Sequence, residues 1–514
     1  MSKTIIIIGA GLAGLSAALQ AAENGCNVKL VSSLPSERAQ SVMAEGGINA
    51  ALNTKDENDS PEEHFTDTIK AACGLADPNA VWGMTQAAPE LVHWLLKLGV
   101  KFNMSGYDDV DLRNFGGQKK KRTAFAQSDT GKQIMTAMID AVRRKEASGM
   151  VERFSHHSFL TLRLCGNICC GCVIRDEYSQ ETVELPGDAV IVATGGMHGL
   201  FGNTTGSLSN TGEVTAELFR LGVPLANGEM IQYHPTTVKC GGKRMLISEA
   251  ARGEGGRLFA MKDGKQWYFM EEKYPELGNL MPRDITAREI WKVSHESEVF
   301  LDMTEISEEI ISNKLSGLAD DCMTYLHKDI RKEPVSVLPG IHYFMGGILV
   351  NEQHRTPLQN LCAAGECCAQ YHGANRLGGN SLLGALYGGR VAAKSACEQA
   401  DVVDLSCATQ IDFPSASQIS EIKQLNKVMQ ETMGVVRNEN TLLNGIQTVQ
   451  TLTGNLPLLG MAVLKSALAR KESRGAHWRE DYPKSNDDDY LKTTVARFDG
   501  KQIQISFVPV PERR

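Results

Sequence analysis

The stretch TIIIIGAGLAG (residues 4–14) joins a run of isoleucines to three glycines spaced as GxGxxG. The isoleucine run predicts a buried parallel strand, and the following LSAALQAAENG predicts a helix. In this setting Gly9 permits a tight turn, Gly11 admits a pyrophosphate and Gly14 lets the helix pack closely on the strand. Together with the strand CNVKLVSS (26–33), the stretch predicts a β-α-β unit that binds a dinucleotide.

The residues that follow favour FAD over NAD. An NAD-binding unit carries an acid at the end of its second strand, where this chain has Ser32 and Ser33. The small residues of AEGGINAAL (44–52) suit contact with a flat ring, and Glu366 in GECC follows an apolar strand, where it would bind a ribose hydroxyl. An exposed turn acid is the alternative for Glu366.

Length, composition and charge narrow the class of protein. A chain of 514 residues predicts roughly two to four domains, and 42% hydrophobic with 22% charged residues is typical of a soluble globular protein. The net charge of −8 argues against a nucleic-acid or membrane-surface role. No secretory signal and no apolar run of roughly 18–20 residues is found. With 13 scattered cysteines, these features predict a cytoplasmic protein with reduced thiols.

The patterns of strands and helices divide the chain into domains. We expect an α/β fold with a Rossmann-like FAD-binding domain built from 1–229 and 340–402. Residues 230–339 lack the β-α-β repeat and predict an inserted α+β capping domain, and 403–514 predict a mainly helical C-terminal domain with a charged tail. Within the FAD-binding domain the predicted elements are helices at 61–73, 79–98 and 129–145, a strand-rich stretch at 151–187 and strands at 188–196 and 358–366.

One dense group of cysteines comprises Cys165, Cys169, Cys170 and Cys172. A metal site is one interpretation, but the spacing of ferredoxin-type iron–sulfur ligands is absent. LTLRLC, a Gly-Asn turn and ICCGCVIRD alternate as a β-hairpin does, which is the interpretation we favour. An iron–sulfur cluster that exchanges electrons with this chain would therefore belong to another subunit.

The stretch HGANRLGGNSLL (372–383) places a fixed cation among glycines ahead of an apolar helix. Arg376 offers a rigid fork that suits a carboxylate. Asn380 and Ser381 are good N-cap residues for the helix that follows, and a helix N-terminus attracts electron-rich groups. The stretch therefore predicts a place where an anionic substrate meets the cofactor.

The inserted domain supplies further polar side chains. Each alone fits a buried histidine, an ion pair or a helix cap. Together they supply the arginine forks and histidine donors that a small dicarboxylate needs. They are His234 in YHPT, Ser248, Glu249 and Arg252 in SEAARGEGG, Arg283 and Asp284 in PRDI, and His342 in HYFMGG.

These motifs carry a resemblance that covers essentially the whole chain. The chain resembles the flavoprotein subunit of fumarate reductase and succinate dehydrogenase, with L-aspartate oxidase a close relative. The motifs are GAGLAG, AEGGINAAL, RTAFAQSDTG (122–131), ATGG (193–196), QYHPT (232–236), SEAARGEGG (248–256), PRDITAREI (282–290), HYFMGG (342–347), GEC (365–367), HGANRLGGNSL and RKESRGAHWREDYP (470–483).

The resemblance implies roles for the residues of the inserted domain and its return loop. His234, Ser248, His342 and Arg376 match the substrate-binding positions of the family. Arg283 matches the arginine that protonates fumarate while flavin N5 gives a hydride to the neighbouring carbon, and Glu249 and Arg252 match the relay that reprotonates it. Because arginine is a poor acid, this chemistry requires a dry, closed site.

The motifs and the resemblance also predict the cofactor contacts, with no metal site. The predicted FAD-binding residues are Gly9, Ala10, Gly11, Gly14, Ser32, Ser41, Ala44, Gly46, Gly47, Ala193, Thr194, Gly195, Glu213, Glu366, Ser381 and Leu382.

Three positions depart from the family pattern. Gln40 stands where much of the family attaches FAD covalently through a histidine, so the resemblance implies non-covalent FAD. It also implies a lower flavin potential, which makes succinate oxidation harder and suits a reductase or an oxidase better. TGDG reads TGEV, which places Glu213 at an FAD-contacting aspartate. HPTG reads HPTT, which places Thr237 beside the substrate.

Three functions follow as hypotheses. The first is an FAD-dependent enzyme of the fumarate reductase and succinate dehydrogenase type, acting on the C=C of a small dicarboxylate. The second is an L-aspartate oxidase. A reductase that acts on another enoate is a further alternative. The third, a non-catalytic FAD-binding subunit, would not need Arg283, Glu249 and both histidines. An iron–sulfur subunit is the electron partner that the family implies, and it would bring the cytoplasmic chain to the inner face of a membrane. A soluble single-chain enzyme is the alternative.

Overall fold

A five-stranded parallel sheet forms the centre of the protein. The computed structural model describes residues 2–106, 109–399 and 419–513. The strand order is β20-β10-β1-β2-β6, and Ile5 of β1 lies opposite both Ala189 and Val28. The strands are β1 (Thr4–Ile8), β2 (Asn27–Ser32), β6 (Val151–Ser155), β10 (Ala189–Val192) and β20 (Leu361–Ala363). The predicted β-α-β unit and the predicted return of the chain to the sheet are confirmed.

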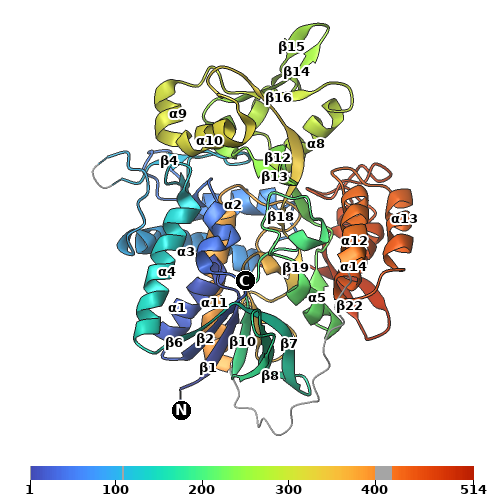
Figure 1. Ribbon diagram of the computed structural model, residues 1–514. Helices are drawn as coiled ribbons and strands as arrows, with labels where there is room; N and C mark the ends of the chain where they lie inside the picture. The colour runs from blue at the N-terminus through green and yellow to red at the C-terminus, as the bar shows by residue number, and fades with distance from the viewer. Residues whose placement is uncertain (1, 107–108, 400–418, 514) are drawn as a thin grey trace.

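Helices cover one face of this sheet. Helix α1 is buried along almost its whole length, because it lies between the sheet and α11 (Figure 1). The two helices pack closely: Ser16 Oγ donates to Leu386 O at 2.6 Å, and a Cβ at Gly389 would lie 2.3 Å from Ala13 O. The helices of this half are α1 (Leu12–Glu23), α2 (Pro61–Ala71), α3 (Pro78–Lys97), α4 (Thr130–Ala147) and α11 (Asn380–Gln399).

A small antiparallel sheet packs on the opposite face. Its strands are β7 (His157–Cys165), β8 (Ile168–Asp176) and β9 (Thr182–Pro186), and β7 and β8 form the predicted hairpin. Cys169 and Cys172 of β8 are buried free thiols, and burial raises the pKa of Cys169 to about 12. Within the described ranges no group of three or more His, Cys, Asp and Glu side chains is arranged to hold a metal ion.

The inserted segment forms a separate layer above the carboxyl ends of the central strands (Figure 1). One sheet has the order β13-β12-β18 and the other the order β15-β14-β16-β17. The predicted boundary between residues 339 and 340 falls within β18, which pairs with β12, so we propose that this domain extends to Phe344. Its elements are β12 (Ile231–Cys240), β13 (Lys243–Leu246), α6 (Glu249–Gly253), β14 (Arg257–Lys262), β15 (Lys265–Trp267), α7 (Phe269–Lys273), α8 (Arg283–Val293), β16 (Val299–Asp302), α9 (Glu308–Lys314), α10 (Ser316–Asp321), β17 (Val335–Ser336) and β18 (Leu338–Phe344).

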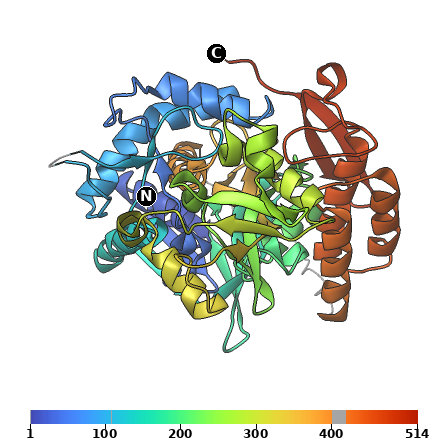
Figure 2. The same ribbon diagram turned by 90° about the horizontal axis from the view of Figure 1, so that it is seen from above.

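The C-terminal part combines helices with a hairpin (Figure 2). Its helices share an apolar core with α5 (Glu213–Arg220), through residues such as Phe219, Leu425 and Leu459. The hairpin completes a sheet of order β21-β19-β11-β22-β23, so the tail returns to the FAD-binding half. The proposed boundary between 402 and 403 lies outside the described residues. The elements are β11 (Leu225–Ala226), β19 (Gly347–Leu349), β21 (Cys368–Ala369), α12 (Ile419–Thr432), α13 (Glu439–Val449), α14 (Asn455–Ala469), α15 (Asp487–Tyr490), β22 (Lys492–Phe498) and β23 (Ile503–Pro509).

Three short strands form a further small sheet. This three-stranded sheet of order β3-β5-β4 contacts α11 through β3 and is formed by β3 (Ile48–Asn49), β4 (Leu112–Arg113) and β5 (Thr123–Ala124). In the part of the chain that the structure covers, no helix has the length and apolar character needed to cross a membrane.

Candidate active site

A cavity of about 560 Å³ runs from the first glycine turn to the inserted domain. Every predicted FAD-binding residue lines it except Gly14. Those that line it are Gly9, Ala10, Gly11, Ser32, Ser41, Ala44, Gly46, Gly47, Ala193, Thr194, Gly195, Glu213, Glu366, Ser381 and Leu382. Residues that are far apart in the sequence thus share one wall, as the motifs predicted.

The glycine turn has the geometry that a pyrophosphate requires. At Gly9 φ is +109°, and a Cβ there would lie 2.3 Å from Ala193 O. A Cβ at Gly14 would lie 1.8 Å from Gly9 O, so Gly14 permits the packing of helix on turn rather than contact with the cavity. At Gly11 the nearest atom to a Cβ, Ser41 Oγ, is 3.6 Å away, which leaves the backbone open to the cavity at the start of α1. These residues fit a dinucleotide phosphate at a helix N-terminus.

Two other positions define the cofactor end. Gln40 lines the cavity and stands at the start of a short 3₁₀ turn. Glu366 Oε1 accepts a hydrogen bond from Phe344 N at 3.0 Å and lies 3.6 Å from His198 Nε2. Phe344 N and His198 therefore orient the Glu366 carboxylate, and Glu366 lines the cavity.

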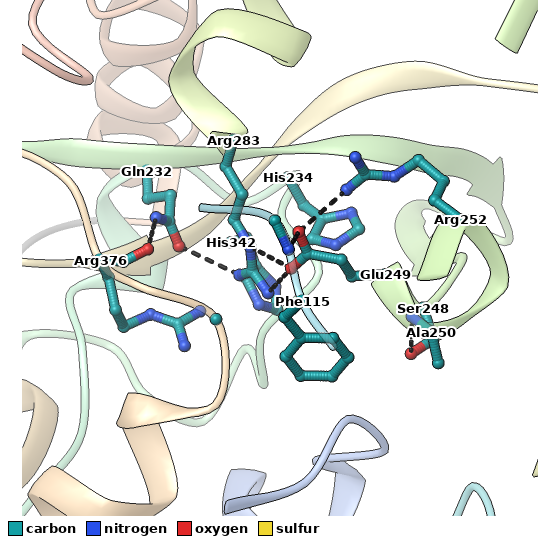
Figure 3. A network of polar contacts seen from close by, with 12 residues as sticks. Phe115, Gln232, His234, Ser248, Glu249, Ala250, Arg252, Arg283, His342 and Arg376 are labelled. Atoms are coloured by element: carbon teal, nitrogen blue, oxygen red, sulfur yellow. Dashed lines mark hydrogen bonds and ion pairs between the residues drawn. The ribbon is translucent and has the colours of Figure 1, made fainter. Parts of the chain in front are cut away.

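The end of the cavity under the inserted domain is built from five separate segments (Figure 3). Strand β12 contributes His234, β18 contributes His342, α8 contributes Arg283, and the loop before α11 contributes Arg376. Ser248 and Glu249, at the start of α6, complete the wall. His234, Ser248, Glu249, Arg283 and Arg376 are all buried, as the cavity lies between the inserted domain and the sheet.

A carboxylate joins two guanidinium groups in this wall. Glu249 Oε2 accepts from Arg283 Nε at 2.8 Å and from Arg283 Nη2 at 2.5 Å. Glu249 Oε1 accepts from Gly116 N at 3.1 Å and lies 3.4 Å from Arg252 Nη2. Burial acts to raise the pKa of Glu249, but Arg283 and Arg252 outweigh it and hold this pKa below its ordinary value. Glu249 is therefore an ionised link between Arg283 and Arg252.

The two histidines are neutral. Burial, reinforced by Arg283, lowers the pKa of both His234 and His342 well below the ordinary value. The rings lie 5.1 Å apart between centroids. His342 Nδ1 is held by Thr205 Oγ1 at 2.8 Å, and His234 Nε2 is buried with no hydrogen-bond partner among the described residues. Both rings are thus suited to hydrogen bonding with a ligand rather than to carrying charge.

Arg376 completes the positive charge of the site. Its guanidinium lies over the Tyr343 ring at 4.3 Å, and its buried Nε has no hydrogen-bond partner in the described structure. Burial, with a contribution from Arg283, lowers the pKa of Arg376 to about 9, so the side chain is charged at neutral pH. Three guanidinium groups (Arg252, Arg283, Arg376) and one carboxylate (Glu249) leave two positive charges, which match a dicarboxylate.

The loop that carries Arg376 is held from two sides. Ala374 N donates to Ala72 O at 3.0 Å, and Ala476 N donates to Ala374 O at 2.9 Å. At Gly475 φ is +54°, and a Cβ there would lie 2.6 Å from Ala374 O. The turn after α2 and a turn in the C-terminal part therefore fix the loop between them.

Some predicted positions differ in the structure. Helix α11 begins at Asn380 itself, whose side-chain oxygen accepts from Asn49 Nδ2 at 2.7 Å, so tertiary contacts replace the predicted N-cap. Arg252 lies behind Glu249 rather than at the cavity, with Nη1 donating to Asn279 O at 2.6 Å. Thr237 does not line the cavity either, because its hydroxyl donates to Leu338 O at 2.7 Å. Ser248 lines the cavity and its Oγ also caps α6 by accepting from Ala250 N at 3.4 Å.

Sequence reasoning did not single out Gln232, Thr205 or Gly116. Gln232 accepts from Arg283 Nη1 at 3.1 Å through Oε1 and donates to Arg376 O at 2.8 Å through Nε2. A signal for it was present, because residues two apart on a strand share a face and Gln232 precedes His234 by two. No local pattern points to Thr205 or Gly116, which reach the site from distant loops.

Comparison with known proteins agrees with this geometry. The FAD binding domain family matches residues 4–382, and the fumarate reductase flavoprotein C-terminal family matches residues 452–513. The succinate dehydrogenase flavoprotein subunit of Bacillus subtilis is 38% identical over 100% of this chain and 98% of its own length. The chain belongs to the succinate dehydrogenase and fumarate reductase flavoprotein family. It is an FAD-dependent oxidoreductase of the class that acts on CH–CH bonds.

Other members of this flavoprotein family are similar along their whole length. The 8-methylmenaquinol:fumarate reductase flavoprotein subunit of Wolinella succinogenes is 32% identical, with 100% of this chain and 92% of that protein covered. Among solved structures, E. coli quinol fumarate reductase FrdA superposes with a TM-score of 0.90 at 27% identity, over 99% of this chain and 97% of that one. The α/β architecture predicted from the sequence is that of this family.

Proposed function

We propose that this flavoprotein reduces fumarate to succinate, with Arg283 as the proton donor. The observation that carries the proposal is the charge of the buried wall, where Arg283, Arg376 and the Glu249 carboxylate face a cavity that also contains the cofactor residues. Arg252 lies directly behind Glu249 and adds the third guanidinium charge. Two positive charges match the two carboxylates of fumarate, and neutral histidines supply hydrogen bonds without adding charge.

Different residues of the wall bind the substrate and transfer the proton. Arg376 and the histidines His234 and His342 bind and orient the two carboxylates. When bound, FAD supplies hydride chemistry at its N5 atom, so one alkene carbon is reduced by the cofactor. Arg283 holds the proton that the other carbon receives, and the ionised Glu249 keeps its guanidinium in place through two hydrogen bonds. Arg252, on the far side of Glu249, is placed to return a proton through this carboxylate.

Burial of the wall supports the use of arginine as an acid. In water a guanidinium rarely loses a proton, but exclusion of water strengthens every charge interaction in the site. Arg283 and Arg252 share a single carboxylate, so loss of a proton from one of them relieves the repulsion between the two. A closing motion of the inserted domain over the cavity would complete the exclusion of water.

The position of Gln40 supports the reductive direction and non-covalent FAD. Gln40 lines the cofactor cavity at the place where the family's covalent histidine is expected, and an amide cannot form that bond. A flavin without the covalent link has a lower potential, which favours donation of electrons to fumarate over their withdrawal from succinate.

The electron partner that we propose is an iron–sulfur subunit. The relatives from Bacillus subtilis and Wolinella succinogenes are flavoprotein subunits, and no metal-binding group of side chains occurs in the described ranges of this chain. Such a partner would bring the chain to the inner face of a membrane from the cytoplasm.

A pair of assays tests the proposal. Purified protein is incubated with reduced viologen and fumarate, and separately with L-aspartate and oxygen. We expect rapid oxidation of viologen by fumarate and no peroxide from aspartate. The reverse pattern would identify an L-aspartate oxidase, and inactivity in both arms alongside reduction of another enoate would assign a different substrate.

A further inference from the structure

A chain of buried amides connects Asp284 to the proton-donating arginine. Asn375 Nδ2 donates to Asp284 Oδ1 at 3.0 Å, and Gln232 Nε2 donates to Asn375 Oδ1 at 2.9 Å. Gln232 Oε1 then accepts from Arg283 Nη1 at 3.1 Å. Gln232 and Asn375 are almost fully buried, so water does not replace these bonds.

Both ends of this chain fix the direction of its hydrogen bonds, because at one end the Arg283 guanidinium only donates and Arg376 O only accepts. At the other end, Asp284 Oδ1 accepts from Asn375 Nδ2, so the Asn375 carbonyl faces Gln232. Gln232 then presents its NH₂ group to Asn375 and its own carbonyl to Arg283. If either amide turned over, two donors or two acceptors would face each other, which is costly in a buried site.

The chain also holds the second arginine of the site. Gln232 Nε2 donates to the backbone oxygen of Arg376 at 2.8 Å, as Figure 3 shows together with its bond to Arg283. Gln232 therefore joins the proton donor to the backbone of the residue proposed to bind a substrate carboxylate. Arg283 is fixed by Glu249 on one side and by Gln232 on the other.

We propose that Asp284 is a positioning residue, which sets the orientation of Asn375 and, through the bond between Asn375 and Gln232, holds Arg283 in line with the substrate. This inference rests on the proposed role of Arg283. Asp284 lies at the start of α8, where the first N–H groups of a helix stabilise a carboxylate. It touches neither the cavity that holds the substrate residues nor Arg283 through its side chain, so its effect passes through the two amides.

Substitutions of Asp284 test whether it acts as a hydrogen-bond acceptor for Asn375. Asp284→Leu has a similar shape but accepts no hydrogen bond, so Asn375 loses the partner that orients it. We expect kcat for fumarate, per bound FAD, to fall roughly ten- to hundredfold, as for a misplaced catalytic group. We expect KM to change by less than about threefold, because Arg376 keeps its charge. Asp284→Asn still offers an acceptor oxygen, and we expect it to restore kcat to near the wild-type value.

Two controls make the experiment decisive. Asp302→Leu removes another aspartate of the inserted domain, which accepts from Thr304 away from the cavity, and we expect wild-type kcat. Gln232→Leu interrupts the chain next to Arg283, so adding Asp284→Leu to it should cause little further loss. Independent effects of the two substitutions would overturn the proposal. So would equal damage by Asp284→Asn and Asp284→Leu, because a charge rather than an acceptor would then be required.

Crystal structures of the variants test the same claim without activity. In Asp284→Leu we expect the bond between Gln232 and Arg283 to be lost or lengthened, and in Asp284→Asn we expect it to be kept. Retention of this bond in the leucine variant would overturn the inference. If Asp284→Leu does not fold with FAD, Asn375→Ala interrupts the chain at the next residue and takes its place. Failure of the wild type to reduce fumarate would instead overturn the proposed function and leave this structural test standing.

Discussion

Replacement of Glu249 by glutamine changes the charge of the site without changing its shape. Glu249 Oε2 accepts two hydrogen bonds from Arg283, and Oε1 accepts one from Gly116 N and pairs with Arg252. In Glu249→Gln, two buried guanidinium groups lose their shared carboxylate, and the NH₂ group must face another donor. The site then holds three positive charges instead of two.

The structure gives the expected loss of stability. Removing one partner of a buried ion pair costs about 3–5 kcal/mol. Glutamine keeps one acceptor oxygen, so we expect a value near the lower limit, about 3 kcal/mol. The low pKa of Glu249 means that its stabilising effect is complete above the pKa of an unfolded glutamate and is lost as pH falls through the lower folded pKa. The difference between wild type and variant should therefore be full at neutral pH and shrink in acid.

The assay is urea unfolding at saturating FAD, with and without malonate as an inert dicarboxylate. We expect Glu249→Gln to unfold at lower urea, to be stabilised more by malonate than the wild type, and to have lost most turnover. Glu217→Gln is the control, because Glu217 is buried and paired with Arg220 but does not line the cavity. It should lose stability without any change in malonate binding. Equal unfolding midpoints and equal malonate affinity for wild type and Glu249→Gln would refute the reasoning.

Three further predictions concern the cofactor and the pH dependence. Acid precipitation should release FAD into the supernatant, because Gln40 forms no bond to it; yellow protein in the pellet would contradict this. Gly14→Ala should lose FAD, because its Cβ would lie 1.8 Å from Gly9 O and overpacking costs about 1–3 kcal/mol, measured by the flavin content of purified protein; full occupancy would count against the packing argument. KM for fumarate should show no titration near the ordinary histidine pKa of about 6.5, because burial lowers the pKa of His234 and His342; a change in KM centred there would show that one of them carries charge.

Local patterns were sufficient for much of the fold and for the ends of the site. The buried strand 4–8 and the glycines after it predict the turn that the structure has, because GxGxxG between a strand and a helix brings the helix N-terminus to the end of a parallel strand. Arg376 was singled out because a fixed cation among glycines ahead of a helix suits an anion, and the role of Arg283 came from the resemblance of PRDI to the family. Motifs from five segments meet in one cavity, four of them from the inserted domain.

The remainder depended on contacts that no local pattern contains. Asn380 has the side chain of an N-cap, but Asn49 and His64 bind its oxygen instead. Gln232 and Asn375 gain their roles from partners more than fifty residues away in sequence, and Thr237 turns toward Leu338 rather than the cavity. Packing between segments that are distant in sequence determines these hydrogen-bond partners, so a local sequence pattern does not predict them.

The turn at residues 474–476 fixes the loop of Arg376, and it is synthesised late. Proteins leave the ribosome N-terminus first, so the FAD-binding half and the inserted domain emerge before this turn exists. Until it arrives, the loop of Arg376 lacks the bond from Ala476 N to Ala374 O. A nascent chain therefore completes the loop of Arg376 last. We expect loss of the final forty or so residues to leave a flavin-binding protein in which this loop is not fixed.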